Sequence, residues 1–279
     1  MVEASVLRST IVGADSSTVL NVPMPGPDAI SPRWPVPQLA NIPAIRWDGY
    51  SVFNGLTLRA EQRLSHGLAF LGSYTLSRAI DDASDPGATS FETNLPQDVR
   101  NMAAERALAS FDHRHRFVGN ATWALPPIGG AFGSNWRVNA IVNLQSGAPF
   151  TVNLGTDHAN IGSGPAQRPD VAGDPNIGGA GTAEQWFNTA VFSLPPPFTF
   201  GNSGRNTVRA PGYANVDASL QKDVVLAGGA RLELRWEIFN LFNRVNFDVP
   251  NRIFGTSNFG RIFSAQPARQ MQFGVKMQF

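Results

Sequence analysis

Three acidic residues form the most compact group of possible metal ligands in the sequence. Asp81, Asp82 and Asp85 lie within one short segment, and carboxylate oxygens are ligands that Ca²⁺ prefers. Their spacing differs from that of an EF-hand, which takes ligands from alternate positions and ends with a glutamate. We therefore interpret them as solvated acids in an external loop at the top of a strand, and we expect no bound metal.

Two histidines are spaced so that they share one face of a strand. His113 and His115 are two residues apart, and two imidazoles could begin a zinc site. Arg114 and Arg116 alternate with them, and their positive charge would oppose a cation. The sequence offers no identifiable third ligand, so we interpret both histidines as residues that pack where a strand enters a membrane.

The other positions of possible chemistry lack the partner groups that a reaction needs. His66 precedes Gly67 in a tight turn, where glycine supplies a positive φ, and His158 lies in a glycine-rich loop without a partner. Ser146 is not in a Gly-x-Ser-x-Gly motif and no His/Asp pair accompanies it. The glycine-rich run 201–206 is not followed by the Lys-Ser or Lys-Thr and the helix of a phosphate loop. We therefore expect neither enzymatic activity nor a cofactor.

The composition is typical of the wall of a membrane barrel. Of the 279 residues, 15% are charged and 42% are hydrophobic, whereas an average soluble domain has about 25% charged residues. The mean hydropathy is nevertheless only −0.13, as expected where apolar and polar residues alternate. A net charge of +1 gives no reason to expect nucleic acid as a partner, and the absence of cysteine excludes disulfides and thiolate metal sites.

A period of two residues runs through several long segments. At the C-terminus, apolar side chains at odd positions 271–279 oppose polar side chains or glycine at even positions, which predicts a strand with one apolar and one polar face. The same alternation marks six further segments, at about residues 56–61, 68–76, 116–123, 136–145, 214–223 and 230–239. The strand from Trp136 is expected to run on through Phe150, Val152 and Leu154. Strands of about ten residues suit a bilayer, because globular strands are nearer five or six.

The connections between these strands alternate between short and long. The short ones are Leu64–Gly67, Pro126–Ser134 and Val225–Gly229, and the long ones are Ser77–Asp112, Gly155–Tyr213 and Asn240–Ala268. Short turns on one side and long loops on the other are typical of outer-membrane barrels. The predicted fold is therefore all-β, an antiparallel transmembrane β-barrel meander. A soluble β-sandwich is the alternative, since it also alternates, but it rarely needs such long strands and loops.

The predicted faces assign roles to several side chains. Trp123 and Trp136 flank a short turn on the apolar face, which predicts an interfacial aromatic belt. The polar face predicts a wide polar lumen lined by Arg59, Arg137, Arg231, Glu233, Arg235 and Glu237. The aromatic residues of the longest loop are expected to pack that loop onto itself or over the barrel mouth, with ligand binding as the alternative. They are Trp186, Phe187, Phe192, Phe198 and Phe200.

Neither a membrane helix nor a targeting segment is evident. No run of about 18 apolar residues occurs, which excludes a transmembrane helix. The first 17 residues lack a basic start followed by an apolar run, so we do not expect a secretory signal peptide there.

Several stretches resemble the β-barrel of TonB-dependent outer-membrane receptors, in particular the Oar-like group. They are YSVFNGLTLRAEQRLSHGLAFLGSYTLSRAIDDASD (50–85), FDHRHRFVGNATWALP (111–126), WRVNAIVNLQSGAPFTV (136–152), RPDVAGDP (168–175), WFNTAVFSLP (186–195), FGNSGRNTVRAPGYANVDASLQKD (200–223) and RLELRWEIFNLFNRVNF (231–247). The resemblance covers roughly residues 15 to 279, and it rests on the order and spacing of these stretches. The terminal strand, with Phe273, Val275, Met277 and Phe279, resembles the signal that the outer-membrane assembly machinery reads.

This resemblance implies a receptor or transporter in the outer membrane of a Gram-negative cell. Its barrel would have about 22 strands, and its partners would be outer-membrane lipid, the barrel assembly machinery and the TonB complex, reached through an N-terminal plug. The substrate stays open among metal, siderophore, saccharide and peptide. This sequence departs from the pattern in showing seven clear strands, or eight with part of the first 15 residues, and no plug.

The sequence is therefore expected to be the C-terminal part of a larger barrel over its whole length. Residues 1–50 would hold a strand remnant and an extracellular loop, 51–154 strands, 155–213 a long extracellular loop and 214–279 the terminal strands. A structural or adhesion barrel and a small passive pore remain alternatives, as does closure of eight strands into an independent barrel. A phospholipase-like enzyme is disfavoured because no His–Ser pair is evident.

Removal of Phe279 should impair insertion of the parent barrel, because a terminal aromatic on an alternating strand resembles the assembly signal. The amount of heat-modifiable, membrane-inserted protein measures this effect. Normal insertion without Phe279 would contradict the terminal-signal interpretation.

Overall fold

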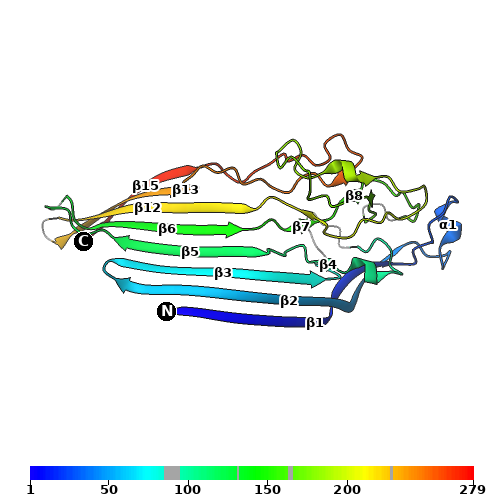
Figure 1. Cartoon of the computed structure of the whole chain (residues 1–279), viewed down its shortest axis with the longest axis horizontal. Coiled ribbons are helices and arrows are strands. Elements are labelled where there is room, and N and C mark those ends of the chain that lie inside the picture. The colour runs from blue at the N-terminus through cyan, green and yellow to red at the C-terminus, as the bar shows by residue number, and fades with distance from the viewer. Residues whose placement is uncertain (85–94, 131, 163–165, 227–228) are drawn as a thin grey trace.

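One antiparallel sheet, whose strands follow each other in chain order, dominates the molecule (Figure 1). The computed structural model describes residues 1–84, 95–130, 132–162, 166–226 and 229–279. The main path of the sheet is β1 (Val2–Leu20), β2 (Ile42–Ser65), β3 (Leu68–Asp81), β5 (His115–Ala124), β6 (Trp136–Gln145), β12 (Tyr213–Val225), β13 (Arg231–Phe239) and β15 (Gln270–Gln278).

Short elements occupy the connections. β4 (Ala107–Leu108) pairs with β3, β7 (Pro149–Phe150) with β11 (Val208–Arg209), β8 (Asn153–Leu154) with β14 (Ile253–Phe254), and β9 (Asp170–Val171) with β10 (Phe192–Ser193). The helices are α1 (Ile30–Arg33) and the 3-10 helices η1 (Met102–Glu105) and η2 (Thr189–Val191). Within the described ranges, none of these helices has the length and hydropathy needed to cross a bilayer.

All the predicted short turns lie at one end of the sheet, the turn end, and the long connections gather at the other, the loop end (Figure 1). The tightest turn joins β2 to β3 through His66 and Gly67, whose φ angles are +52° and +80°. Such a pair of positive φ values matches the twist of an antiparallel hairpin. A Cβ on Gly67 would also meet the Ala124 carbonyl oxygen at 2.5 Å, so the turn fits closely against the end of β5.

The seven predicted strands are present, and several are longer than the sequence pattern indicates. β2 has 24 residues and β3 has 14. The prediction of a strand remnant and loop over residues 1–50 was wrong, because β1 is a full strand of 19 residues paired with β2 along its length. The pattern hides β1 because Arg8 interrupts the apolar positions while Leu7 and Ile11 occupy polar ones.

The predicted continuation of β6 as far as Leu154 was also wrong. β6 ends at Gln145, and the chain then passes so close to another segment that a Cβ on Gly147 would meet the Ala210 carbonyl oxygen at 1.7 Å. Phe150, Val152 and Leu154 keep the parity of the strand but are buried among the loops, at 3%, 0% and 3% exposure. Burial among the loops removes these side chains from water more completely than one face of an open sheet would.

The register of the sheet separates an apolar face from a polar face. Directly paired residues point to the same side of a sheet, and one such row is apolar across six strands. It consists of Leu68, Trp123, Val138, Leu220, Trp236 and Phe273. The neighbouring row on the other side is polar and consists of Thr122, Asn139, Ser219, Glu237 and Gln272. We call these two sides the apolar face and the polar face.

Hydrogen bonds connect side chains of the polar row across strands. The Thr122 hydroxyl donates to Asn139 Oδ1 at 2.9 Å, and Asn139 Nδ2 donates to the Ser219 hydroxyl oxygen at 3.0 Å. Gln272 Nε2 donates to a carboxylate oxygen of Glu237. These bonds make the polar face an ordered surface across β5, β6, β12, β13 and β15.

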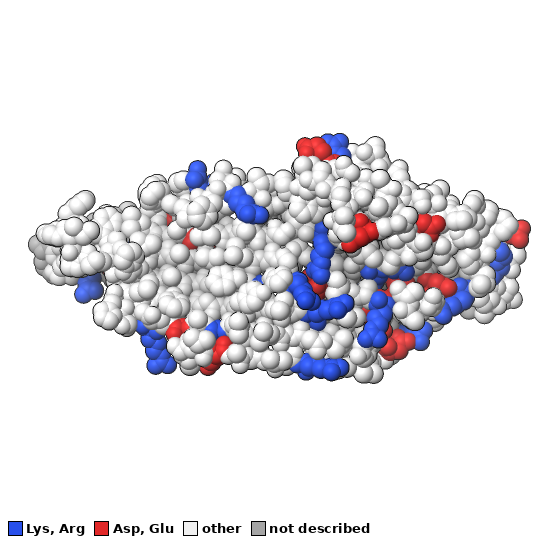
Figure 2. Space-filling view, in the orientation of Figure 1, with Lys and Arg blue, Asp and Glu red and all other residues white. Residues whose placement is uncertain are grey.

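The apolar face has an uncharged band of bilayer height. On β3 it runs from Leu68 to Leu76 without a charged residue, and Arg78 follows at the next position on that face. Nine strand residues at about 3.3 Å each, tilted by about 40°, give a height of ~23 Å, close to the ~25 Å apolar band of outer-membrane barrels. Figure 2 shows few charges over the middle of the strands and more around the loop end.

An arginine introduced at Val142 should destabilise the folded barrel by about 2–4 kcal/mol, because Val142 lies on the apolar face near mid-band, paired with Gly119 and Val216. Urea titration of the refolded parent barrel in lipid vesicles measures the loss. The matched control is Val118→Arg, the same substitution at nearly the same height on the polar face, where it pairs with Ser73 and Asn143. Equal effects at the two positions would show that the facing is wrong.

Candidate functional site

The long connections fold together at the loop end around an apolar cluster, which we call the loop core (Figure 1). Its buried residues are Phe150, Val152, Phe187, Phe192, Val208 and Ala210. The Phe187 ring makes edge contacts with Phe150, Phe192 and Phe259, at centroid distances of 5.8, 6.1 and 5.2 Å. Such aromatic pairs stabilise beyond the area that they bury. The loops therefore form a packed layer of their own.

The structure confirms that most of the loop aromatics pack the loops together. Phe187 and Phe192 are in the loop core, Trp186 packs against it, and the Trp186 indole N–H donates to the Arg209 carbonyl at 2.8 Å. Phe200 packs against a second cluster made of Val19, Val22, Ala159 and Ile161. Phe198 differs, since it remains 39% exposed at a positive φ of +61°.

Three arginines of the long loop between β8 and β12 form ion pairs with acids beside the strands. We call these the anchor pairs: Arg168–Glu105, Arg205–Asp81 and Arg209–Asp112. Arg168 donates from both terminal nitrogens to both Glu105 oxygens, at 3.0 and 2.6 Å, and the two side chains are only 4% and 3% exposed. Arg209 Nη2 lies 3.1 Å from Asp112 Oδ2. Such two-pronged pairs fix orientation as well as position.

The anchor pairs fix the loops to the polar side of the sheet. Asp81 ends β3 and belongs to the polar face, so Arg205 approaches the sheet from that side. Asp112 also accepts a hydrogen bond from the Ala79 backbone N–H at 2.8 Å. The loop layer is therefore held over the loop end of the polar face by buried charges.

The acidic group predicted from sequence is divided in the structure. Asp81 is 1% exposed and paired with Arg205, so its interpretation as a solvated loop acid was wrong: the loop arginine reaches it from far along the chain. Asp82 Oδ1 accepts from the Tyr50 backbone N–H at 2.7 Å. Asp85 lies outside the described residues.

Each described histidine of the loop end has its own partner. His113 Nδ1 donates to the Ser146 carbonyl at 2.6 Å, and His115 Nδ1 lies 2.7 Å from the Tyr74 hydroxyl, with the two rings stacked. The prediction that His158 has no partner was wrong, because its Nε2 donates to the Pro195 carbonyl at 2.8 Å. In the part of the chain that the structure describes, no three His, Cys, Asp or Glu side chains are placed to hold a metal ion.

Ser146 and the glycine-rich run serve the backbone of the loops. The Ser146 hydroxyl oxygen accepts the His115 backbone N–H at 3.1 Å. In the run 201–206, a Cβ on Gly201 would meet the Arg168 carbonyl oxygen at 2.2 Å, so this glycine permits close approach of two loop segments. The Arg205 and Asn206 side chains are buried, and Asn206 Nδ2 donates to the Leu108 carbonyl at 2.7 Å.

The residues predicted to line a lumen share the polar face. Arg235 donates to Glu233 and Glu237 of its own strand, at 2.7 and 3.4 Å. The register places Arg137 and Arg235 on either side of Gln221 in one row. Arg231 lies at the start of β13, and Arg59, on β2, pairs with Glu61 at 2.9 Å. Their shared face is established by the register, and their lumenal role stays a prediction.

The predicted belt and terminal residues lie on the apolar face. Trp123 pairs with Leu68 and Val138, while Trp136 pairs with Lys222, whose ammonium is 5.4 Å from the indole ring. Phe273, Val275 and Met277 continue this face on β15. Phe279 follows the end of the strand and is fully exposed. Their roles in a membrane belt and in assembly stay predictions.

The acids and arginines of the anchor pairs were not found by sequence reasoning. Glu105 and Arg168 are 63 residues apart, and Asp81 and Arg205 are 124 residues apart. The signal that could have drawn attention to them is the occurrence of Arg168, Arg205 and Arg209 in a chain with few charges.

Comparison with known proteins places this architecture. Residues 10–272 match the model of a family described as an outer membrane beta barrel domain. Among solved structures, the outer membrane transporter YddB from Escherichia coli aligns with 100% of this chain and 30% of its own, at a TM-score of 0.52 and 10% identity. No curated protein matches the sequence. At this identity the structural likeness shows the fold alone, and the chain spans less than a third of that protein.

Replacing Arg168 with alanine should loosen the loop core, because it leaves the Glu105 carboxylate buried without its counter-ion, at a cost of about 3–5 kcal/mol. Hydrogen exchange of residues 166–210 in the folded parent protein measures the change. Arg46→Ala is the matched control, since its pair with Asp48 is 48% and 41% exposed and contributes about 0–1 kcal/mol. Unchanged exchange in Arg168→Ala would contradict the anchoring role.

Proposed function

Because the chain belongs to the family of outer membrane beta barrel domains, we propose that it supplies wall and extracellular loops to a TonB-dependent receptor or transporter. The chain lies in the outer membrane, and the transport role is the step proposed here. In this proposal the plug and the contact with TonB come from parts of the protein outside this chain. The chain itself catalyses no reaction.

The open sheet is the observation that carries the proposal. Within the described residues, β1 pairs only with β2, and β15 only with β13, and these two strands form opposite edges of the sheet (Figure 1). In hydrocarbon an unpaired strand edge leaves backbone N–H and C=O groups without partners, at several kcal/mol each. Further strands must therefore continue the wall on both sides.

The polar face supports a wide barrel rather than a small one. A barrel of eight strands is just wide enough for side chains to fill its interior. Here the polar face includes charged groups such as Arg137, Arg235 and Glu237, and Arg137 and Arg235 are exposed. Charges of this kind are stable where water reaches them, as in a lumen wide enough for substrate.

The loop layer supplies a first contact for substrate. A pocket of about 280 Å³ opens in it, lined by polar side chains of the segments before η1 and after β10. They are Gln97, Asp98, Asn101, Asn202 and Ser203. Amide and hydroxyl groups of this type bind hydroxylated or peptide-like molecules, so a saccharide or a peptide is the substrate class that the proposal favours.

A small passive pore is the second candidate, because eight is also the smallest strand number of closed outer-membrane barrels. It would require β1 and β15 to pair with each other. A structural or adhesion barrel would use the same wall and present the loop layer to another surface.

The mass and partners of the natural protein test the proposal. Antibodies against residues 168–210 should detect, in outer-membrane fractions, a species much larger than the 30.0 kDa of this chain. That species should bind the purified periplasmic domain of TonB, with a version lacking its N-terminal region as the control. A heat-modifiable 30 kDa species that conducts ions in planar bilayers without TonB would identify a pore and overturn the proposal.

A further inference from the structure

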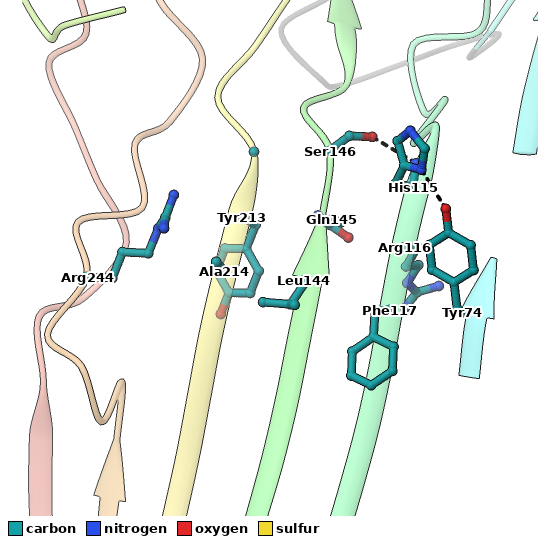
Figure 3. Close-up of a pocket in the computed structure, with 11 residues that line it drawn as sticks. Tyr74, His115, Arg116, Phe117, Leu144, Gln145, Ser146, Tyr213, Ala214 and Arg244 are labelled. Atoms are coloured by element: carbon teal, nitrogen blue, oxygen red, sulfur yellow. Dashed lines mark hydrogen bonds between the residues drawn. The ribbon is translucent and has the colours of Figure 1, made fainter. Parts of the chain in front are cut away.

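A groove of about 400 Å³ lies at the loop end of the apolar face, across β3, β5, β6 and β12 (Figure 3). Its floor is one row of directly paired residues: Tyr74, Phe117, Leu144 and Ala214. This row belongs to the face that meets lipid, since it lies two rows from the row containing Trp123 and Val138 on the same side. The groove is therefore accessible from the lipid and not from the polar face.

Cationic and hydrogen-bonding groups surround this apolar floor. His115, Arg116, Ser146 and Arg244 are among the lining residues, and the lining includes no carboxylate. Arg244 lies across the groove from Tyr74 and His115 (Figure 3). Its guanidinium is exposed and makes no hydrogen bond or ion pair with any part of the chain that the structure describes. His115 uses Nδ1 for Tyr74, which leaves Nε2 for a ligand.

The same margin of the apolar face carries two further cations. Arg8 and Arg78 pair directly with Asn54 from either side, so the three form one row on this face. Both arginines are exposed, and neither makes an ion pair within the described residues. The loop-end margin of the lipid-facing surface is thus positive along its length, above an uncharged band.

Guanidinium groups at this height need an anionic partner in the membrane. Arginine is costly in the hydrocarbon but favourable at the level of lipid headgroups, where phosphate accepts its hydrogen bonds. A phosphate free in water would gain nothing from the apolar floor of Phe117 and Leu144. A molecule with both a phosphate and an acyl chain fits both parts of the groove.

We propose that this groove binds a phosphorylated, acylated glycolipid of the outer leaflet. Its phosphate lies between Arg244 and His115, and an acyl chain lies along Phe117 and Leu144. Phe242 and Val245, on either side of Arg244 in sequence, are 73% and 59% exposed and provide further apolar contact for the lipid. The proposal rests on the outer-membrane location and is independent of transport.

The amount of glycolipid that the natural protein retains in nanodiscs tests this site. The probe is bisphosphorylated lipid A, added as a minor component of phosphatidylcholine nanodiscs and quantified by mass spectrometry after washing. Arg244→Ala should lower retention about tenfold, because it removes one charge-assisted contact with phosphate. Ala214→Phe, which keeps every charge but fills the floor of the groove, should also lower retention.

Arg63→Ala is the matched control, since Arg63 is exposed at the turn end and its removal should leave retention unchanged. Heat-modifiable mobility confirms that each variant is folded. Arg244→Lys should restore part of the binding. Full retention by Arg244→Ala, equal retention of dephosphorylated lipid, or complete displacement of lipid by millimolar inorganic phosphate would each overturn the proposal.

Discussion

Backbone hydrogen bonding in the absence of water is the constraint on which this structure depends. In the hydrocarbon of a bilayer, an N–H or C=O without a partner costs several kcal/mol, so a chain that crosses with strands must pair each strand with its neighbours. From β2 to β13, the strands of the main path meet this condition with antiparallel ladders on both sides. Irregular backbone begins only beyond the ladder, as at Gly147 after the end of β6.

The same ladder determines where the side chains can be buried. A sheet one layer thick has no interior, so its two faces differ by the solvent that each one meets. The Trp236 and Phe273 rings stack at 5.8 Å on the apolar face, while Thr122, Asn139 and Ser219 join by hydrogen bonds on the polar face. The water-excluding core of the described chain lies instead among the loops, around Phe187 and Val208. Two kinds of stabilisation therefore meet at the loop end.

Local alternation explains why much of the sheet could be predicted from sequence. A period of two fixes which side chains share a face, so β5, β6, β12, β13 and β15 and their apolar residues follow from the pattern. β1 could not be found in this way, because Arg8 occupies an apolar position of an edge strand. Nor could the anchor pairs, since each joins residues that no local period relates. Parity alone also could not end β6, because Phe150 and Val152 fit the alternation yet gain more burial in the loop core.

The anchor pairs limit which parts of the wall can move during uptake, if the barrel transports. Breaking one buried pair by removing a partner costs about 3–5 kcal/mol, and three such pairs hold the long loop to Asp81, Glu105 and Asp112. Opening the loop core as a lid would separate several buried charges together and expose Phe187 and Phe192. A fixed platform is the more stable arrangement. Substrate would then pass beside this platform, and the moving gate would belong to the lumen rather than to these loops.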